Sequence, residues 1–271
     1  MSKVTVVIPV YNYEKYIVLA IKSVLSQTYA DWKLIIVDDN SDDNTSQFIS
    51  EFLSDSRITY IYLQENQGTG NALNVALKLI DTPYFMILDA DDWLDEEAID
   101  ILLDEMEQQP ETTSTVSSQL NRWETNADDT RFIDLIKHRR FTKNEKYEFL
   151  LYAPMLYPRF LRTESVRLVN GFELDDPYKG RYGEDRYLLY KLIGISDFHY
   201  VNKPLYNRRI HNSNAVRSEN RIKFVEAKKY VIKKILNLWG NEFEPIWSLT
   251  TDGWLALKLK ALKDDLIEYY I

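Results

Sequence analysis

Short apolar runs alternate with longer amphipathic stretches over the first 110 residues. The apolar runs have the length and β-branched content of buried strands; they lie at 4–10, 33–37, 58–63 and 84–88. The stretches between and after them predict helices; these lie at 13–27, 46–53, 70–80 and 96–106. This alternation predicts an α/β fold with a Rossmann-like, mostly parallel central sheet and helices on both faces.

Beyond residue 110 the alternation fades. The residue pattern still predicts a few isolated elements; we expect strands at 114–120, 159–163 and 204–211, and helices at 164–169, 186–193 and 221–239. The polar segment 121–146 has no pattern that predicts a structure. We expect residues 217–271 to form a C-terminal helical segment.

Three carboxylates follow the apolar run at 84–88, namely Asp89, Asp91 and Asp92. Their mutual repulsion requires a cation, water or hydrogen-bond donors nearby. Mg²⁺ or Mn²⁺ held by one or two carboxylates and by phosphate oxygens would meet this need, at the strand end where open α/β sheets bind ligands. The alternative is that the acids from Asp92 to Glu97 belong to the first turn of the next helix, where its dipole favours negative charge.

A second strand also ends in acids, because Asp38 and Asp39 follow the run at 33–37. The carboxyl ends of parallel strands lie on the same edge of a sheet. We therefore expect one acidic crevice, with the loop at Tyr11 and Asn12 beside it. Asn12 is also a candidate N-cap for the helix that follows.

Composition narrows the class of protein. The chain has 271 residues, a net charge of −9 and no cysteine. The acidic balance argues against a nucleic-acid partner, and the absence of cysteine excludes disulfides and thiolate chemistry. No apolar run approaches the ~20 residues that span a bilayer, and the first residues do not resemble a signal peptide. We expect a cytoplasmic protein, with peripheral contact at the inner face of the membrane as an open option.

The segment 221–239 has six basic side chains and one acidic one, Glu226. A basic amphipathic helix can lie on an anionic membrane or bind a partner, and this helix could mediate a homo-oligomer. The simpler interpretation is a packed helix with a solvated basic face.

An ordered series of motifs resembles the family 2 glycosyltransferases, which have a GT-A fold. Each motif is weak alone, but together they follow the order of the family across about residues 3–215. They are Val7–Asn12, Ser23–Tyr29, Ile36–Ser41, Asn66–Gly68, Leu88–Asp92, Asn170–Phe172 and Gly183–Asp185. The resemblance implies a glycosyltransferase domain at 1–216, with a nucleotide-sugar-binding half at 1–110 and an acceptor-binding half at 111–216.

The resemblance implies an inverting enzyme that moves a hexose or N-acetylhexosamine from a UDP-sugar to a hydroxyl of a glycan, glycolipid or glycoprotein. In this family a strand-end carboxylate and a loop tyrosine hold the nucleotide base; a carboxylate can accept the uracil N3 hydrogen and an aromatic ring can cover the base. The donor contacts implied here are Pro9, Tyr11, Asn12, Asp39, Asn66, Gly68, Asp89 and Ala90.

The resemblance also implies roles for the remaining site residues. Asp91 matches the direct metal ligand of an Asp-x-Asp motif, with Asp89 toward ribose and the waters of Mn²⁺ or Mg²⁺, and His211 as a further ligand. Asp185 matches the general base, and Glu184 an acceptor contact. From the residues alone, Glu184 and Asp185 could equally be first-turn acids of a helix.

Two alternatives remain open at this point. One is a nucleotide-sugar or glycan binding module without turnover, which would have no need of a base at Asp185. The other is a phospho-receiver-like domain, in which a strand-end aspartate such as Asp89 accepts phosphate. The length of 271 residues is about twice that of such a domain.

Overall fold

The computed structural model describes residues 2–126, 129–154, 156–211, 220–250 and 255–262. Its N-terminal half contains four parallel strands in the order β3-β2-β1-β4, as the sequence pattern predicts. These strands are β1 (Val4–Val10), β2 (Trp32–Asp38), β3 (Ile58–Tyr62) and β4 (Tyr84–Ile87). The helices that connect or follow them are α1 (Ile17–Leu25), α2 (Thr45–Ser50), α3 (Thr69–Leu79) and α4 (Ala98–Gln108).

The second half of the chain extends the same sheet with strands of mixed direction. β8 pairs antiparallel with β4, β6 pairs antiparallel with β8, and β9 pairs parallel with β6. The strands of this half are β5 (Trp93–Leu94), β6 (Thr113–Asn126), β7 (Asp129–Ile136), β8 (Tyr157–Arg162) and β9 (Asp197–Ile210). The α/β prediction is therefore confirmed, although β9 starts seven residues before the predicted strand at 204.

The segment 121–146, which had no predicted structure, contains the end of β6 and the whole of β7. These two strands form an antiparallel pair, and the apolar residues of β7 do not alternate with polar ones along the strand; they are Phe132, Ile133, Leu135 and Ile136. Charged residues face one another across the pair, with Arg122 bound to Asp134 and Arg131 bound to Glu124. Cross-strand ion pairs stabilise such a ribbon without alternating hydrophobicity, so its sequence gives no period-two signal.

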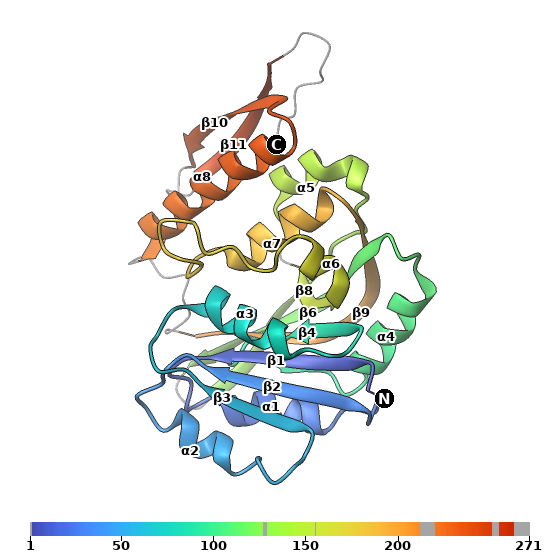
Figure 1. Ribbon diagram of the computed structural model, residues 1–271, viewed down its shortest axis with the longest axis vertical. Helices are drawn as coiled ribbons and strands as arrows, with labels where there is room; N and C mark the ends of the chain where they lie inside the picture. Colours follow the sequence, from blue (N-terminus) through green and yellow to red (C-terminus); the bar gives the residue numbers. More distant parts are fainter. Residues whose placement is uncertain (1, 127–128, 155, 212–219, 251–254, 263–271) are drawn as a thin grey trace.

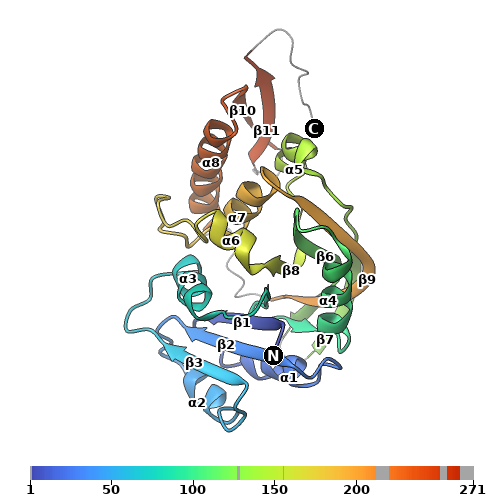
Figure 2. The same ribbon diagram turned by 45° about the vertical axis from the view of Figure 1, so that its right-hand side comes forward.

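Helices cover both faces of the sheet (Figures 1 and 2). One apolar cluster packs α1 and α4 against one face, and a second packs α3 and α7 against the other. The remaining short helices are α5 (Lys146–Tyr152), α6 (Thr163–Leu168) and α7 (Glu184–Ile193), with a 3-10 turn at Lys143–Glu145. α7 begins two residues before the predicted helix at 186, so Glu184 and Asp185 lie in its first turn.

The C-terminal segment, which was expected to be helical, is helical only in part. The helix α8 (Arg221–Leu238) is followed by an antiparallel hairpin of β10 (Phe243–Leu249) and β11 (Leu255–Ala261). In β11 the leucines at 255, 257 and 259 are buried and alternate with more exposed residues. This period of two belongs to a strand with one buried face.

The C-terminal elements share an apolar cluster with the helices of the main sheet. Val231 and Ile235 of α8 and Leu259 of β11 are buried in the same cluster as Leu188 and Leu192 of α7. α8 is thus a packed helix, which supports the simpler interpretation of its basic face. Among the described residues, no helix has the length and hydropathy needed to cross a bilayer.

Candidate active site

A cavity of about 600 Å³ lies at the carboxyl ends of β1 and β4. The turn after β4 contributes Asp89 and Asp91 to its wall, and the first turn of α7 contributes Glu184 and Asp185. Residues about 95 positions apart in the chain are thereby brought to one space. The acids of the fourth strand and the proposed base therefore face the same cavity.

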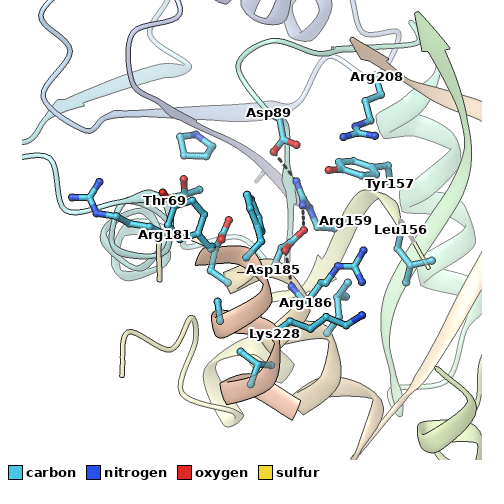
Figure 3. A pocket seen from close by; sticks show the side chains of 18 of the residues that line it. Thr69, Asp89, Leu156, Tyr157, Arg159, Arg181, Asp185, Arg186, Arg208 and Lys228 are labelled. Atoms are coloured by element: carbon cyan, nitrogen blue, oxygen red, sulfur yellow. Dashed lines mark hydrogen bonds and ion pairs between the residues drawn. The ribbon is translucent and has the colours of Figure 1, made fainter. Parts of the chain in front are cut away.

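Arg159 joins these two groups of acids. It lies on β8, opposite Ile87 of β4. Its guanidinium donates from Nη2 to Asp89 Oδ1 at 2.7 Å and from Nη1 to Asp185 Oδ2 at 2.7 Å (Figure 3). The Arg159 side chain is only 5% exposed, so the charge of this cation is compensated mainly by the two carboxylates.

Asp91 is paired with His211, which follows the end of β9. Asp91 Oδ2 and His211 Nε2 lie 2.9 Å apart, and the imidazole packs against the Tyr16 ring at 4.5 Å between centroids. Two ligands at about 2.1 Å from one ion and at a right angle to each other are about 3.0 Å apart. A carboxylate oxygen and an imidazole nitrogen with this separation fit Mn²⁺ or Mg²⁺.

Few further candidate metal ligands accompany Asp91 and His211. No group of three or more acidic, histidine or cysteine side chains with metal-ligand spacing occurs in the described part of the chain. Asp89, the other predicted ligand, is bound to Arg159 instead. A site with two protein ligands suits Mg²⁺ or Mn²⁺, because these ions complete their coordination with water and substrate phosphates.

Asp92 differs from Asp89 and Asp91 because residues of β9 hold its carboxylate by hydrogen bonds. The Tyr206 hydroxyl donates to Asp92 Oδ2 at 2.8 Å, and the Arg209 backbone N–H donates to Oδ1 at 2.7 Å. The Arg209 side chain also donates to the Asp91 carbonyl at 2.9 Å. Burial, together with the charges of Asp91 and Asp89, raises the pKa of Asp92. These contacts hold the turn that presents Asp89 and Asp91.

The predicted donor contacts divide into two sets. Pro9 and Ala90 line the cavity together with Asp89. The remaining predicted contacts lie outside its lining, at Tyr11, Asn12, Asp39, Asn66 and Gly68.

Asp39, which follows β2, and Gly68, which precedes α3, lie in two loops that hydrogen bonds tie together beside the cavity. Asp39 accepts the backbone N–H of Gln67 at 2.9 Å and of Gly68 at 2.7 Å. Burial raises the Asp39 pKa, and these two donors oppose the shift. Gly68 has a φ of 96°, and a Cβ there would lie 2.6 Å from the Arg181 side chain, so the position requires glycine. Arg181 in turn binds Asn66 and lines the cavity.

The interpretation of Asn12 as a helix N-cap is wrong. α1 begins only at Ile17, and Asn12 has a φ of 59°. The Asn12 side chain donates to Asp42 Oδ1 at 2.6 Å and accepts the Asp42 N–H at 2.9 Å. Asn12 therefore ties the loop after β1 to the loop after β2. The preceding residue, Tyr11, is 41% exposed.

Comparison with known proteins identifies the chain. A model described as "Glycosyl transferase family 2" matches residues 5–162, which is more than half of the chain. The chain belongs to glycosyl transferase family 2. This membership excludes the phospho-receiver alternative, because a phospho-receiver domain belongs to a different protein family.

The family relatives are longer than this chain. Chondroitin synthase of Escherichia coli is 30% identical over 250 residues, which cover 87% of this chain and 35% of that protein. The crystal structure of S. aureus TarS 1-349 in complex with UDP-GlcNAc has a TM-score of 0.65 at 18% identity, over 87% of this chain and 67% of that one. The mannosyltransferase PcManGT from Pyrobaculum calidifontis, in complex with GDP-Man and Mn²⁺, has a TM-score of 0.61 at 17% identity, over 87% and 64%. The two structures show a shared fold.

Sequence reasoning missed the basic and aromatic residues that organise this family 2 site. Arg159 is the one charged residue between Tyr157 and Leu161 in a buried strand. A charge in such an apolar run was the one sequence feature that could have indicated a role in the site. Tyr206 and Arg209 lie on an expected strand, but nothing in their spacing indicates that they bind the turn after β4. The contacts become visible only when β9 is placed beside that turn.

Glu184 gives a pH-dependent prediction. Burial, and next the Asp185 carboxylate, raises the Glu184 pKa from 4.5 to about 8. A raised carboxyl pKa destabilises the fold as pH rises from the unfolded-state value toward the folded-state value, and the loss is constant above it. Glu184→Gln is therefore expected to match the parent protein near pH 4.5 and to melt at least about 3 °C higher near pH 8. Thermal unfolding across this range is the measurement.

The exposed Glu51 provides the control for this prediction. Glu51→Gln should leave the difference in melting temperature constant across the same pH range. A Glu184→Gln variant that gains no stability at pH 8 would show that Glu184 is ionised there without cost.

Proposed function

We propose that this chain is an inverting, metal-dependent glycosyltransferase. It moves a hexose or N-acetylhexosamine from a UDP-sugar to a hydroxyl of a glycan acceptor, in the assembly of a cell-surface polysaccharide or a glycoprotein glycan. The observation that carries the proposal is that Asp91 and Asp185 line one cavity. An inverting displacement needs a cation near the leaving diphosphate and a base near the acceptor, and Asp91 and Asp185 are the side chains that would meet these two needs.

In this proposal Asp185 is the general base. Its carboxylate takes the proton of the acceptor hydroxyl while the acceptor oxygen forms a bond to the anomeric carbon. The bond from that carbon to the β-phosphate oxygen breaks on the opposite face, and UDP leaves with the electron pair. Arg159 holds Asp185 Oδ2, and the Arg186 N–H at 2.7 Å holds Oδ1, so the carboxylate has a fixed orientation.

The other residues bind and orient the substrates. Asp91 and His211 would hold Mn²⁺ or Mg²⁺, which offsets negative charge on the departing diphosphate when bound. Asp89 would contact the ribose and water bound to the ion, and Glu184 would contact the acceptor. The donor nucleotide lies at the carboxyl-terminal edge of the sheet. Its contacts there are Pro9, Tyr11, Asn12, Asp39, Asn66, Gly68 and Ala90.

The relatives support the choice of substrates. A structural neighbour binds UDP-GlcNAc, a sequence relative is a chondroitin synthase, and another neighbour binds a nucleotide sugar together with Mn²⁺. Since this chain spans 35% of the chondroitin synthase, its own donor and acceptor require direct measurement.

The proposal is tested by binding and turnover together. With Mn²⁺ present, UDP at 100 times its dissociation constant should stabilise the fold by about 2.7 kcal/mol, which thermal unfolding detects. UDP-glucose, UDP-galactose and their N-acetyl forms, each with a range of glycan acceptors, should give acceptor-dependent release of UDP from one donor. Tight UDP binding without transfer from any donor would favour the non-catalytic binding module, and absence of UDP binding would reject both.

A further inference from the structure

The cavity continues past Asp185 to an end that carries two cations on different helices. Arg186 follows Asp185 on α7, and Lys228 lies on α8 across the cavity. Figure 3 shows Asp89, Arg159 and Asp185 in succession, with Arg186 and Lys228 next to each other on the far side of Asp185. We call Arg186 and Lys228 the cation pair.

The protein compensates the two cations unequally. Burial lowers the pKa of Arg186, but the neighbouring Tyr190 and Asp185 side chains more than offset this effect and raise it. The Lys228 ammonium donates to the Leu255 carbonyl at 3.1 Å. Burial, and next the positive charge of Arg186, lowers the Lys228 pKa. In the described ranges no carboxylate lies within ion-pair distance of either head group, and the nearby Asp185 is bound to Arg159. Two like charges in a partly buried space repel each other, and an anion that reaches them would favour the charged form of both.

A third donor faces the same end of the cavity. Tyr190 lies one turn after Arg186 on α7, lines the cavity and is 2% exposed. Burial raises the pKa of Tyr190, and the nearby Arg186 guanidinium opposes this shift. The hydroxyl is buried, and no group in the described part of the chain meets the geometry of a hydrogen bond to it. A buried hydroxyl without a partner is destabilising, so its position beside the cation pair indicates a ligand that accepts hydrogen bonds. The rest of the wall is mainly apolar, with Leu189, Val231 and Leu255.

We propose that the cation pair and Tyr190 bind a phosphoryl group of the acceptor. This inference rests on the proposed function, in which the acceptor hydroxyl lies at Asp185 and the donor lies on the side of Asp89 and Asp91. A ligand group that lies on the far side of Asp185, away from the donor, then belongs to the acceptor. The apolar wall suits the part of the acceptor that adjoins the phosphoryl group.

The number and type of donors favour phosphate over carboxylate. A guanidinium alone satisfies a planar carboxylate with one charge by two parallel hydrogen bonds. A guanidinium, an ammonium and a hydroxyl from two helices instead match several oxygens around a tetrahedral centre. Two sources share this chemistry, namely a sugar linked to a lipid through a diphosphate and a polymer joined by phosphodiesters.

The test measures binding of defined probes to the full chain with saturating UDP and Mn²⁺, so that the donor side is occupied. The probes are hexyl glucosyl phosphate, hexyl glucosyl diphosphate, the neutral hexyl glucoside and the carboxylate hexyl glucuronide. By calorimetry, a phosphorylated probe should bind at least about tenfold more tightly than the neutral one. A preference for the diphosphate would indicate a lipid-linked acceptor, and a preference for the phosphate would indicate a phosphodiester polymer.

Charge-removing variants assign the preference to the cation pair. Arg186→Gln and Lys228→Gln should each remove most of the tenfold preference while UDP still binds, which also shows that the variants are folded. Lys233→Gln removes the same charge from an exposed position of α8 and should keep the preference. Equal binding of phosphorylated and neutral probes, stronger binding of the glucuronide, or a preference that survives in both variants would overturn the inference. UDP binding without phosphate preference rejects this inference alone, whereas absence of UDP binding rejects the proposed function as well.

Discussion

Replacement of Asp185 by Asn is expected to lower kcat for sugar transfer by about 10³ while UDP still binds. Asn has the same shape, and its side-chain oxygen can still accept a hydrogen bond from Arg159. It cannot take a proton from the acceptor hydroxyl at neutral pH. The measurement is acceptor-dependent UDP release at saturating donor, with UDP affinity determined separately by calorimetry.

Asp104→Asn is the matched control for this variant, because Asp104 is an exposed acid on α4, away from the cavity lining. It should keep full turnover. If Asp185→Asn retained more than about a tenth of the parent rate, Asp185 would not be the base, because general-base removal typically costs 10²–10⁴ in rate.

Asp91→Ala is expected to lower kcat/KM by at least about 100-fold and to weaken Mn²⁺ binding in the presence of UDP by a similar factor. The substitution removes one of the two side chains that fit the ion and leaves His211 alone. The Asp91 side chain is 11% exposed and lies at the cavity wall, so loss of ligand affinity should exceed loss of stability. Mn²⁺ titration by calorimetry and steady-state kinetics measure the two effects.

Asp92→Asn gives the informative contrast to Asp91→Ala. Asp92 is bound to Tyr206 and to the Arg209 backbone, so its substitution should affect stability more than Mn²⁺ affinity. The idea of Asp91 as a ligand fails if Asp91→Ala binds Mn²⁺ as the parent protein does.

The first half of the fold was predictable because each element carries its own signal. The buried strands are continuous apolar runs, and the helices between them have a regular apolar face. The later elements depend on contacts between distant residues. β6 and β7 are held by pairs such as Arg122 with Asp134, and no property of either segment alone reveals that pairing.

The candidate site was predictable to the extent that it lies at strand ends. Asp89, Asp91 and Asp185 were named from the sequence, and the structure places them on one cavity. The residues that hold these acids were not found, since Arg159 and Tyr206 act through β8 and β9, far away in the chain. Asn12 and Asp39 were named as donor contacts, and the structure shows them tying loops together; their contact with a nucleotide stays a prediction.

The apolar cluster that α8 and β11 share with α7 limits how the chain can be modified. Val231 and Ile235 fill space beside Leu188 and Leu192, and a Cβ on Gly194 at the end of α7 would lie 2.5 Å from Trp239 Nε1. Exchanging residues 217–271 for the tail of a relative would therefore create voids or clashes under α7, which also presents Asp185. Grafts intended to alter acceptor choice should keep these interior side chains and vary only those that face the cavity.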